Sequence, residues 1–428
     1  MPPKRMYLQL AASAAVLGGN VVLGYGVSVV LTRLLGLEGF GIYSVVIALV
    51  TMLTAPAFFG LPTLIGREVS WASSKGEFGL VAGLVRRSHQ FIVCVAAAMI
   101  VGAFLVQLVA GKSSPALYWA LPLILLMSLA AARSAMLRGI GKVLEGQWPE
   151  QLLRPALLIG LALAWVALDR VISPTVAVAL TGLAALIALG VSLLQWGLSK
   201  PKALKGVRPI YRDAAWLKAV IPFALSTGVL VISAQISLVI LGAIRGPEEV
   251  AVFRVASQTA QLCALGYTAA IMNISPRIAA AFASSDRTLM QRTARQGALF
   301  ATAFCLPAAL VLIVGGKPLL SLMFGSTYSV GASVMAILAF GQILNSAFGC
   351  GASLLNMTGH ERDCTIALGG GLVLQVLGSL ALVPLWGATG AAIAGVIGIL
   401  GSNIALQQMA IARTGIDPAI WSGLFRRG

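Results

Sequence analysis

Apolar residues in this chain gather in long runs, and polar residues are confined to the short gaps between the runs. A helix needs about 20 mostly apolar residues to cross a bilayer. Twelve runs meet or approach that length, near residues 8–32, 41–65, 89–110, 116–137, 152–168, 174–197, 218–243, 252–275, 298–315, 331–357, 364–384 and 387–410. The pattern predicts an all-α polytopic membrane protein with about 12 transmembrane helices.

Positive charge is distributed unevenly over the gaps between these runs. The chain is 59% hydrophobic and 10% charged, against about 25% charged in globular proteins, and its net charge is +17. Of its 30 Lys and Arg residues, 24 fall in alternate gaps and at the two ends. This is the positive-inside pattern, which places both termini in the cytoplasm. The positive charge therefore indicates topology, and the hydropathy excludes a soluble nucleic-acid binder.

Residues that carry catalysis or hold cofactors do not form recognisable groups in the sequence. The five Cys residues are scattered without a CxxC pair, and His89 and His360 lie far apart, so we predict no metal site. The run Gly369–Gly371 lies in an apolar segment without a Walker-type GK[ST] sequence. We therefore predict no enzyme activity and no cofactor.

A ten-residue segment occurs twice, 210 positions apart. Residues 36–45 read GLEGFGIYSV and residues 246–255 read GPEEVAVFRV, so that Gly36 is paired with Gly246 and Tyr43 with Phe253. The same offset lays the first apolar run over the seventh. Each copy holds six runs, and an even number gives both copies the same orientation, as in transporters built from parallel repeats.

The repeat divides the chain into two predicted lobes. We expect an N-terminal six-helix lobe at 1–199, a basic cytoplasmic linker at 200–217 and a C-terminal six-helix lobe at 218–428. Two pseudo-symmetric lobes around a central cleft suggest a transporter that rocks between inward-open and outward-open states. A duplicated structural bundle that transports nothing is the alternative.

Acidic residues avoid the apolar runs, whereas neutral polar residues occur inside them. Charges in the hydrocarbon core cost about 2.5–3.5 kcal/mol each on insertion scales, and none of the 13 Asp and Glu residues lies there. This argues against cation coupling through a buried carboxylate. The candidates for a polar cleft that binds hydroxyl-rich cargo are Asn20, Gln235, Gln258, Gln261, Asn273, Gln342 and Asn345, with Gln375 and Asn403 in the last two runs. For each, the alternative is a hydrogen bond between helices.

Three arginines are candidates for contact with an anion. Arg33 and Arg254 lie near the outer ends of their helices, within or beside the repeated segment, and Arg133 lies in the last inner turn of the fourth run. The fork of the guanidinium group matches phosphate oxygens better than an ammonium group does. The alternative is that these side chains reach out to lipid head groups.

Four segments resemble a known family in order along nearly the whole chain. They are LTRLLGLEGFGIYSVV (31–46), LRGIGKVLEGQWPEQLLRP (137–155), LLNMTGHERD (354–363) and LVPLWGATGAAIAGVI (382–397). They are similar to segments of Wzx-type oligosaccharide flippases, the polysaccharide biosynthesis transporters of the multidrug/oligosaccharidyl-lipid/polysaccharide (MOP) exporter superfamily. The resemblance implies a V-shaped, MATE-like fold of two six-helix lobes in the bacterial inner membrane.

The resemblance also implies a cargo and partners. The cargo would be an oligosaccharide on an undecaprenyl-pyrophosphate type of carrier, moved to the outer leaflet for O-antigen, lipopolysaccharide or exopolysaccharide synthesis. Partners would be membrane lipids and, in glycan assembly, a polysaccharide polymerase, with no nucleic acid. Arginines face the pyrophosphate in the family, but Asn20 occupies the middle of the first run here, which moves the expectation to Arg33, Arg254 and Arg133. The alternatives are a drug or small-cation exporter of the same superfamily and a non-transporting scaffold for glycan enzymes.

Overall fold

The computed structural model describes residues 3–58, 60–110, 114–204 and 206–422. Lys112, Lys205, Arg426 and Arg427, which contribute to the charge pattern above, lie outside the described residues. The chain forms two compact units, residues 1–231 and 232–428, and the boundary falls inside one helix. The predicted lobe boundaries, with a linker at 200–217, stay a prediction.

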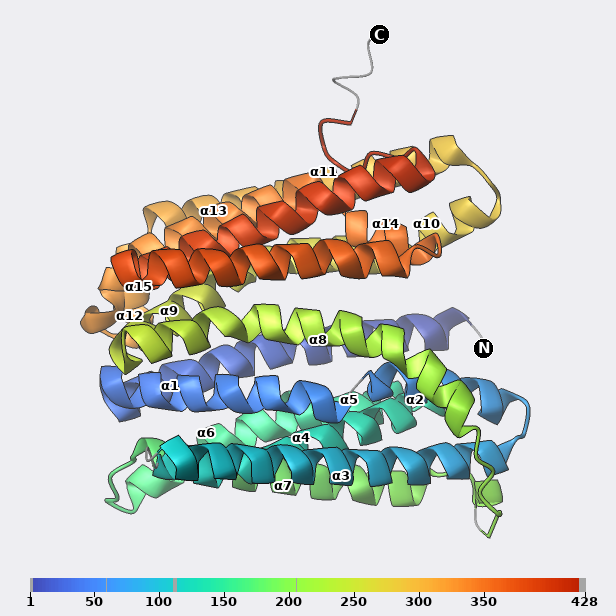
Figure 1. The fold of residues 1–428 in the computed structure, drawn as a ribbon, viewed down its shortest axis with the longest axis horizontal. Coiled ribbons are helices and arrows are strands. Elements are labelled where there is room, and N and C mark those ends of the chain that lie inside the picture. Colours follow the sequence, from blue (N-terminus) through green and yellow to red (C-terminus); the bar gives the residue numbers. More distant parts are fainter. Residues whose placement is uncertain (1–2, 59, 111–113, 205, 423–428) are drawn as a thin grey trace. The chain divides into compact units, whose positions relative to one another are not determined.

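The described residues of unit 1, residues 1–231, are helical throughout apart from short connections (Figure 1). In chain order the elements are α1 (Pro3–Phe58), α2 (Leu61–Ser74), α3 (Phe78–Ala110), α4 (Pro115–Gly139), α5 (Val143–Trp148), the π-helical turn η1 (Pro149–Leu153), α6 (Arg154–Ala167), α7 (Pro174–Ser199), the short turn η2 (Lys202–Leu204) and the beginning of α8 (Asp213–Ile244).

Unit 2, residues 232–428, continues with the rest of α8. It then contains α9 (Pro247–Ala260), η3 (Gln261–Ala264), α10 (Leu265–Ala283), α11 (Arg287–Val314), α12 (Gly316–Phe324), η4 (Ser326–Gly331), α13 (Ala332–Phe348), α14 (Gly351–Met357) and α15 (Glu361–Thr414).

Nine helices within the described residues are long and apolar enough to cross a membrane. Two of them are unusually long. Helix α1, broken at Gly36, contains the first predicted run and most of the second, which ends in α2, and α15, broken at Gly387, contains the last two. The eighth predicted run is divided between α9 and α10 by the turn η3, and the fifth is longer than predicted because α5, η1 and α6 are continuous. The count of twelve stays a prediction.

The repeated segment adopts the same backbone conformation in both copies. Gly36 has φ 69° and ψ −172°, and Gly246 has φ 98° and ψ 178°. This region of positive φ and extended ψ is accessible almost only to glycine. The two matched glycines therefore make the same kind of bend between two helices, at the positions that the sequence offset of 210 pairs.

Small residues bring the helices of unit 1 together. In α4, seven of the 12 buried residues are Ala or Ser. Apolar side chains gain little by leaving lipid for protein, so close backbone approach through small residues carries much of the packing in membranes. A Cβ atom at Gly146 of α5 would lie 2.7 Å from the carbonyl oxygen of Ser134 on α4. Larger residues face outward in both units: Leu198 of unit 1 and Val314 of unit 2 are 87% and 85% exposed.

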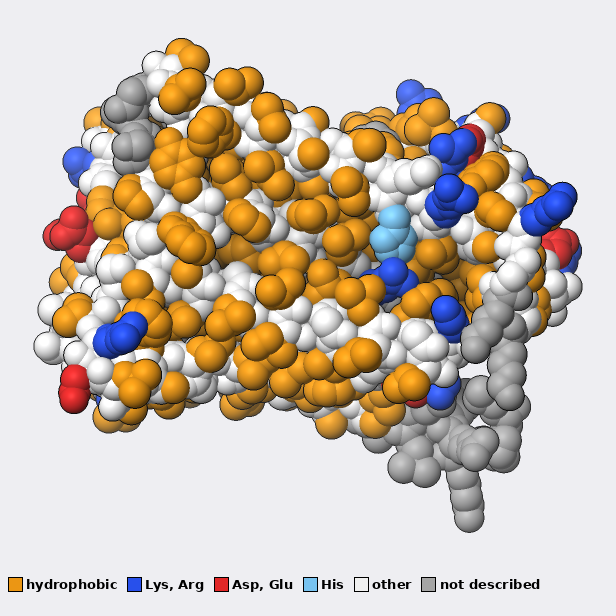
Figure 2. Space-filling model, turned by 90° about the horizontal axis from the view of Figure 1, so that it is seen from below, with side chains coloured by type: hydrophobic (Ala, Val, Ile, Leu, Met, Phe, Trp, Pro, Cys, Tyr) orange, Lys and Arg blue, Asp and Glu red, His pale blue; other side chains and the backbone are white. Residues whose placement is uncertain are grey.

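Hydrophobic side chains cover most of the face in Figure 2, and Lys, Arg, Asp and Glu gather mainly toward its two ends. A lipid-facing surface is expected to look like this, because charge is costly at the bilayer centre.

The break in α15 is held by an acidic residue of α9. The carboxylate of Glu249 accepts a hydrogen bond from the backbone N–H of Ala388 at 2.6 Å and pairs with Arg245 at 3.3 Å. A side chain at Gly387 would collide with that carboxylate. Glu249 thus caps the second arm of α15, where the first backbone N–H groups have no partner within the helix.

Candidate functional site

A polar cavity of about 460 Å³ lies within unit 2. Its walls come from α8, α9, η3, α13 and α15. Its lining consists of Ser233, Ala234, Gln235, Ser237, Phe253, Arg254, Ser257, Gln258, Ala260, Gln261, Leu338, Gln342, Gln375, Gly395 and Ile399. The volume falls within the range of about 300–1,000 Å³ that is typical of small-molecule sites.

Helix α9 supplies the only charged side chain and a row of polar ones. Arg254 and Gln258 are four residues apart, and Gln261 follows three residues later at the start of η3. Residues three and four apart lie on the same face of a helix. The remaining buried residues of α9, such as Val252 and Val255, pack into the unit, and this holds the polar face toward the cavity.

The glutamine on α15 is fixed by hydrogen bonds to α8. The Nε2 atom of Gln375 donates to the backbone oxygen of Ser233 and to the Oγ atom of Ser237, each at 3.0 Å. On α8, the buried Oε1 atom of Gln235 has no hydrogen-bond partner among the described residues. A buried acceptor of this kind is costly unless a donor reaches it, and a ligand hydroxyl or a water molecule would serve.

The cavity combines hydrogen-bonding amides with one positive charge. Five glutamines and three serines line it, and no Asp or Glu is found among its lining residues, all of which the structure describes. Amides donate and accept hydrogen bonds, as sugar hydroxyls do, and the guanidinium of the half-buried Arg254 can bind an anion. Phe253 is the one aromatic residue of the lining. The chemistry of the lining suits a neutral or anionic polar ligand better than a cation.

The structure brings together five of the ten residues selected from the sequence. Gln235, Arg254, Gln258, Gln261 and Gln342 all line the cavity. Their role in binding stays a prediction.

The other five lie elsewhere, and two of them are in unit 2. Asn345 accepts a hydrogen bond from Asn403 at 2.8 Å, so it joins α13 to α15, as the alternative interpretation proposed. Asn273 has an exposed side chain that donates to the carbonyl oxygen of Ala269 in its own helix at 2.9 Å.

The remaining three belong to unit 1. Asn20 is half-buried and Arg33 exposed, both on α1. Arg133 on α4 lies over the ring of Trp196, with its guanidinium carbon 5.8 Å from the ring centre. Its Nε atom is buried without a hydrogen-bond partner among the described residues. The cation–π contact gives Arg133 a packing partner on α7.

Sequence reasoning did not select the serines of the cavity. Ser233 and Ser237 flank Gln235 in the segment SAQIS, and Ser257 precedes Gln258. Polar residues so close together in an otherwise apolar run were the available signal. Metal-binding groups of three or more His, Cys, Asp or Glu are not found among the described residues.

Comparison with known proteins identifies related families and folds. The family described as "Polysaccharide biosynthesis protein" matches residues 11–282, and the family described as "MatE" matches residues 222–380. A search of curated proteins found no match.

Three solved structures illustrate the likeness in fold. An inward-facing multidrug resistance MATE family transporter of the MOP superfamily has a TM-score of 0.76 at 15% identity, covering 92% of this chain and 94% of that chain. The lipid II flippase MurJ, in an inward closed conformation, has a TM-score of 0.70 at 15% identity, covering 94% and 87%.

The third is a MOP superfamily transporter from Pyrococcus furiosus, whose binding pocket is described as having reverse polarity. It has a TM-score of 0.63 at 14% identity, covering 95% of this chain and 93% of that chain. These likenesses confirm the predicted fold class: a helical, multi-pass membrane protein with the fold of MOP superfamily transporters.

Proposed function

The chain belongs to the polysaccharide biosynthesis protein family, and on that basis we propose that it flips a lipid-linked oligosaccharide across the inner membrane of a bacterium. The cargo is an oligosaccharide on a polyprenyl pyrophosphate, which moves from the cytoplasmic to the outer leaflet for surface polysaccharide synthesis. The observation that carries the proposal is the cavity of unit 2, with its five glutamines, its single arginine and no acidic residue in the lining.

Each part of the cargo has a matching group in this cavity. Sugar hydroxyls pair with the amides of Gln258, Gln261 and Gln342, and the unpartnered oxygen of Gln235 accepts one of them. The pyrophosphate pairs with the guanidinium of Arg254, since charge-assisted hydrogen bonds to oxyanions are about twice as strong as neutral ones. Arg33 and Arg133 are second candidates for the pyrophosphate at other stages of transport.

Transport follows from the different solubilities of head and tail. The head group cannot cross hydrocarbon, whereas the polyprenyl tail can stay in the bilayer while the two lobes rock around the head. A pyrophosphate carries about two negative charges, and the cell interior is negative. Outward movement is then favoured by roughly 4–5 kcal/mol per 100 mV if the charge is not compensated. No coupling carboxylate in the cavity is required.

The test uses purified protein in vesicles that carry a polyprenyl-pyrophosphate oligosaccharide in the inner leaflet. The measurement is the rate at which the sugar becomes accessible to an external membrane-impermeant oxidant, with and without a potassium-diffusion potential, inside negative. We expect protein-dependent exposure that is faster with the potential. Protein-dependent exposure at an unchanged rate would remove the voltage term alone, and no protein-dependent exposure would overturn the proposal.

The same vesicles distinguish the two other hypotheses. A small-cation exporter would move a fluorescent organic cation and leave the sugar in place. A scaffold for glycan assembly would move neither compound in these vesicles, whereas in cell membranes extracted with detergent it would retain glycan enzymes such as a polymerase.

A further inference from the structure

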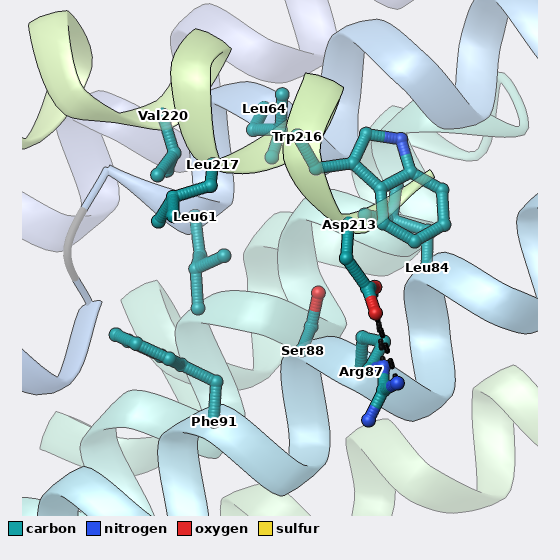
Figure 3. Close-up of a pocket in the computed structure, with 10 residues that line it drawn as sticks. All are labelled: Leu61, Leu64, Leu84, Arg87, Ser88, Phe91, Asp213, Trp216, Leu217 and Val220. Atoms are coloured by element: carbon teal, nitrogen blue, oxygen red, sulfur yellow. Dashed lines mark hydrogen bonds and ion pairs between the residues drawn. The ribbon is translucent and has the colours of Figure 1, made fainter. Parts of the chain in front are cut away.

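A second cavity, in unit 1, has chemistry that the transport of sugars does not use. It has a volume of about 220 Å³ and lies among α2, α3 and the first turns of α8 (Figure 3). Leu61 and Leu64 from α2, Phe91 from α3 and Leu217 and Val220 from α8 give it apolar walls. Such walls suit a hydrocarbon chain.

One polar atom inside this apolar cavity has no partner. Ser88 on α3 is 2% exposed, and its Oγ atom forms no hydrogen bond with any described residue. In Figure 3 the hydroxyl points away from α3 toward the α8 side chains across the cavity. Leaving a buried hydroxyl without a partner is costly, so Ser88 marks a position where a ligand acceptor is expected.

The rim of the cavity is positively charged. Arg87 lines it and forms an ion pair with Asp213 at 2.9 Å, while its guanidinium carbon lies 4.7 Å from the ring centre of Tyr211. Next to these lining residues in the chain, Arg86, Arg212 and Lys218 are exposed. Arg87 and Asp213 therefore lie at the cavity itself, and three further exposed cations adjoin its lining residues in the sequence.

Aromatic residues indicate the depth of the cavity in the membrane. Trp216 lines it, and Tyr211 and Trp71 are exposed close to its basic residues, with the guanidinium of Arg212 6.0 Å from the Trp71 ring centre. Trp and Tyr are enriched where head groups meet acyl chains. The charge pattern of the sequence assigns this end of the helices to the cytoplasmic side.

We propose that this cavity binds an anionic glycerophospholipid of the cytoplasmic leaflet. One acyl chain lies against Leu61, Leu64 and Phe91, the ester carbonyl accepts a hydrogen bond from Ser88, and the phosphate lies at the basic rim. The ester carbonyl distinguishes a glycerophospholipid from other anionic lipids, because it supplies an acceptor between the phosphate and the acyl chain. A polyprenyl phosphate combines a phosphate with an apolar chain but has no carbonyl to reach the Ser88 hydroxyl.

The experiment is native mass spectrometry of the full-length protein after removal of lipid. The protein is titrated with phosphatidylglycerol, with phosphatidylcholine of the same acyl chains and with a polyprenyl phosphate. We expect one phosphatidylglycerol to bind more tightly than phosphatidylcholine. Ser88→Ala should weaken binding by about threefold, through one neutral hydrogen bond. Leu217→Trp, at a position that is 56% exposed, should obstruct the cavity and abolish binding.

Two comparisons separate the site from general charge attraction and from other lipids. The pair Arg86→Ala and Arg212→Ala should weaken binding about tenfold. The pair Arg292→Ala and Arg295→Ala removes the same charge from the exposed side of α11 and should leave binding unchanged. A diether analogue of phosphatidylglycerol should bind like the Ser88→Ala variant binds the diester.

Four results would overturn the proposal: equal binding of the two phospholipids, equal losses from both arginine pairs, unchanged binding in Leu217→Trp, or preferential binding of a polyprenyl phosphate. A correctly folded Leu217→Trp variant is recognised by a thermal unfolding midpoint close to that of the unchanged protein. If that variant unfolds, Ser88→Ala and the diether analogue decide the question.

Discussion

The second helices of the two halves begin after equivalent glycines but differ in their surfaces. At the offset of 210, Arg254, Gln258 and Gln261 of the second half correspond to Ser44, Ala48 and Thr51 of the first. Ser44 and Ala48 are buried, at 4% and 1% exposure, whereas their counterparts line the polar cavity. The repeat preserved the bend at the paired glycines, and the two faces then acquired different chemistry.

The first helices of the halves differ in the same way. Gln235 corresponds to Tyr25, which is buried. In the second helix of the first half, the hydroxyl group of Tyr43 lies 3.2 Å from that of Thr181 on α7, within hydrogen-bond distance, so this polar group faces protein. The first half therefore uses this region for packing and the second half for a cavity. The comparison shows that a duplicated fold fixes where helices bend, while the side chains on one face decide what they hold.

The largest effect on transport is expected when Arg254 of the second half is replaced by serine, the residue at the equivalent position 44 of the first half. Arg254→Ser should lower the rate of cargo flipping by about 10- to 150-fold, since a charge-assisted hydrogen bond contributes about 1.5–3 kcal/mol. Arg254→Lys should retain part of the activity. The assay is sugar exposure in vesicles at equal protein content. Flipping by Arg254→Ser at the original rate would remove this residue from the site.

A smaller effect, a loss of folding stability, is expected to be equal when the bend glycine of either half is replaced. Gly36→Ala and Gly246→Ala should each destabilise the protein by about 1–3 kcal/mol, because alanine is strained at these angles although a Cβ atom has open space at both positions. Thermal unfolding in detergent measures the change. Gly18→Ala and Gly228→Ala, a second pair at the offset of 210 with open space inside helices, should show no such loss. Unequal losses at Gly36 and Gly246 would contradict their equivalence.

The neutral side chains of the cavity should contribute less than the arginine. Gln258→Ala, which copies Ala48, should slow flipping by up to about tenfold through the loss of one or two neutral hydrogen bonds of about 0.5–1.5 kcal/mol. Asn273→Ala, outside the cavity, is the control. The same vesicle assay applies, and equal effects of the two substitutions would show that polarity in unit 2 matters in general, without a site.

The smallest expected effect is a pH-dependent difference in stability between the start of α11 in the second half and the start of α3 in the first. Thr288 and the backbone N–H of Leu289 donate hydrogen bonds to Asp286 at 2.7 and 2.9 Å, and these bonds hold the pKa of this carboxyl below its usual value. A lowered pKa means that the cap stabilises the helix above the ordinary Asp range and loses its effect as the pH falls through the folded-state pKa.

Amide hydrogen exchange is the measurement for this cap. Acidification should speed exchange in the first turn of α11 and leave the start of α3 less affected, after exchange rates are corrected for pH. Exchange that rises equally in both helices would mean that Asp286 is not the cause.

Much of the fold could be predicted from the sequence. The apolar runs indicated the helices, and the offset of 210 paired Gly36 with Gly246, which share a positive-φ conformation that is accessible almost only to glycine. The division of the eighth run at Gln261 could not be predicted, since the residues on both sides of it favour helix equally well.

The candidate site was predicted in part. Gln258 and Gln261 were selected as polar residues one helical turn apart, and Arg254 as an anion contact near a helix end; all three line the cavity, and their role in binding stays a prediction. Asn345 and Asn273 could not be separated from them, because helices that are apolar all round give no sign of which face meets protein. The contact of Asn345 with Asn403 depends on tertiary packing between residues 58 positions apart.

Helix α8 belongs to both compact units, since the boundary at residues 231 and 232 lies within its continuous span from Asp213 to Ile244. One continuous helix therefore connects the two units. Pro222 lies in the first third of this helix and removes one backbone hydrogen bond there, which makes the helix easier to bend at that point. Ser233 and Gln235 follow this boundary directly on the same helix, so the cavity wall and the last element of unit 1 belong to one continuous helix.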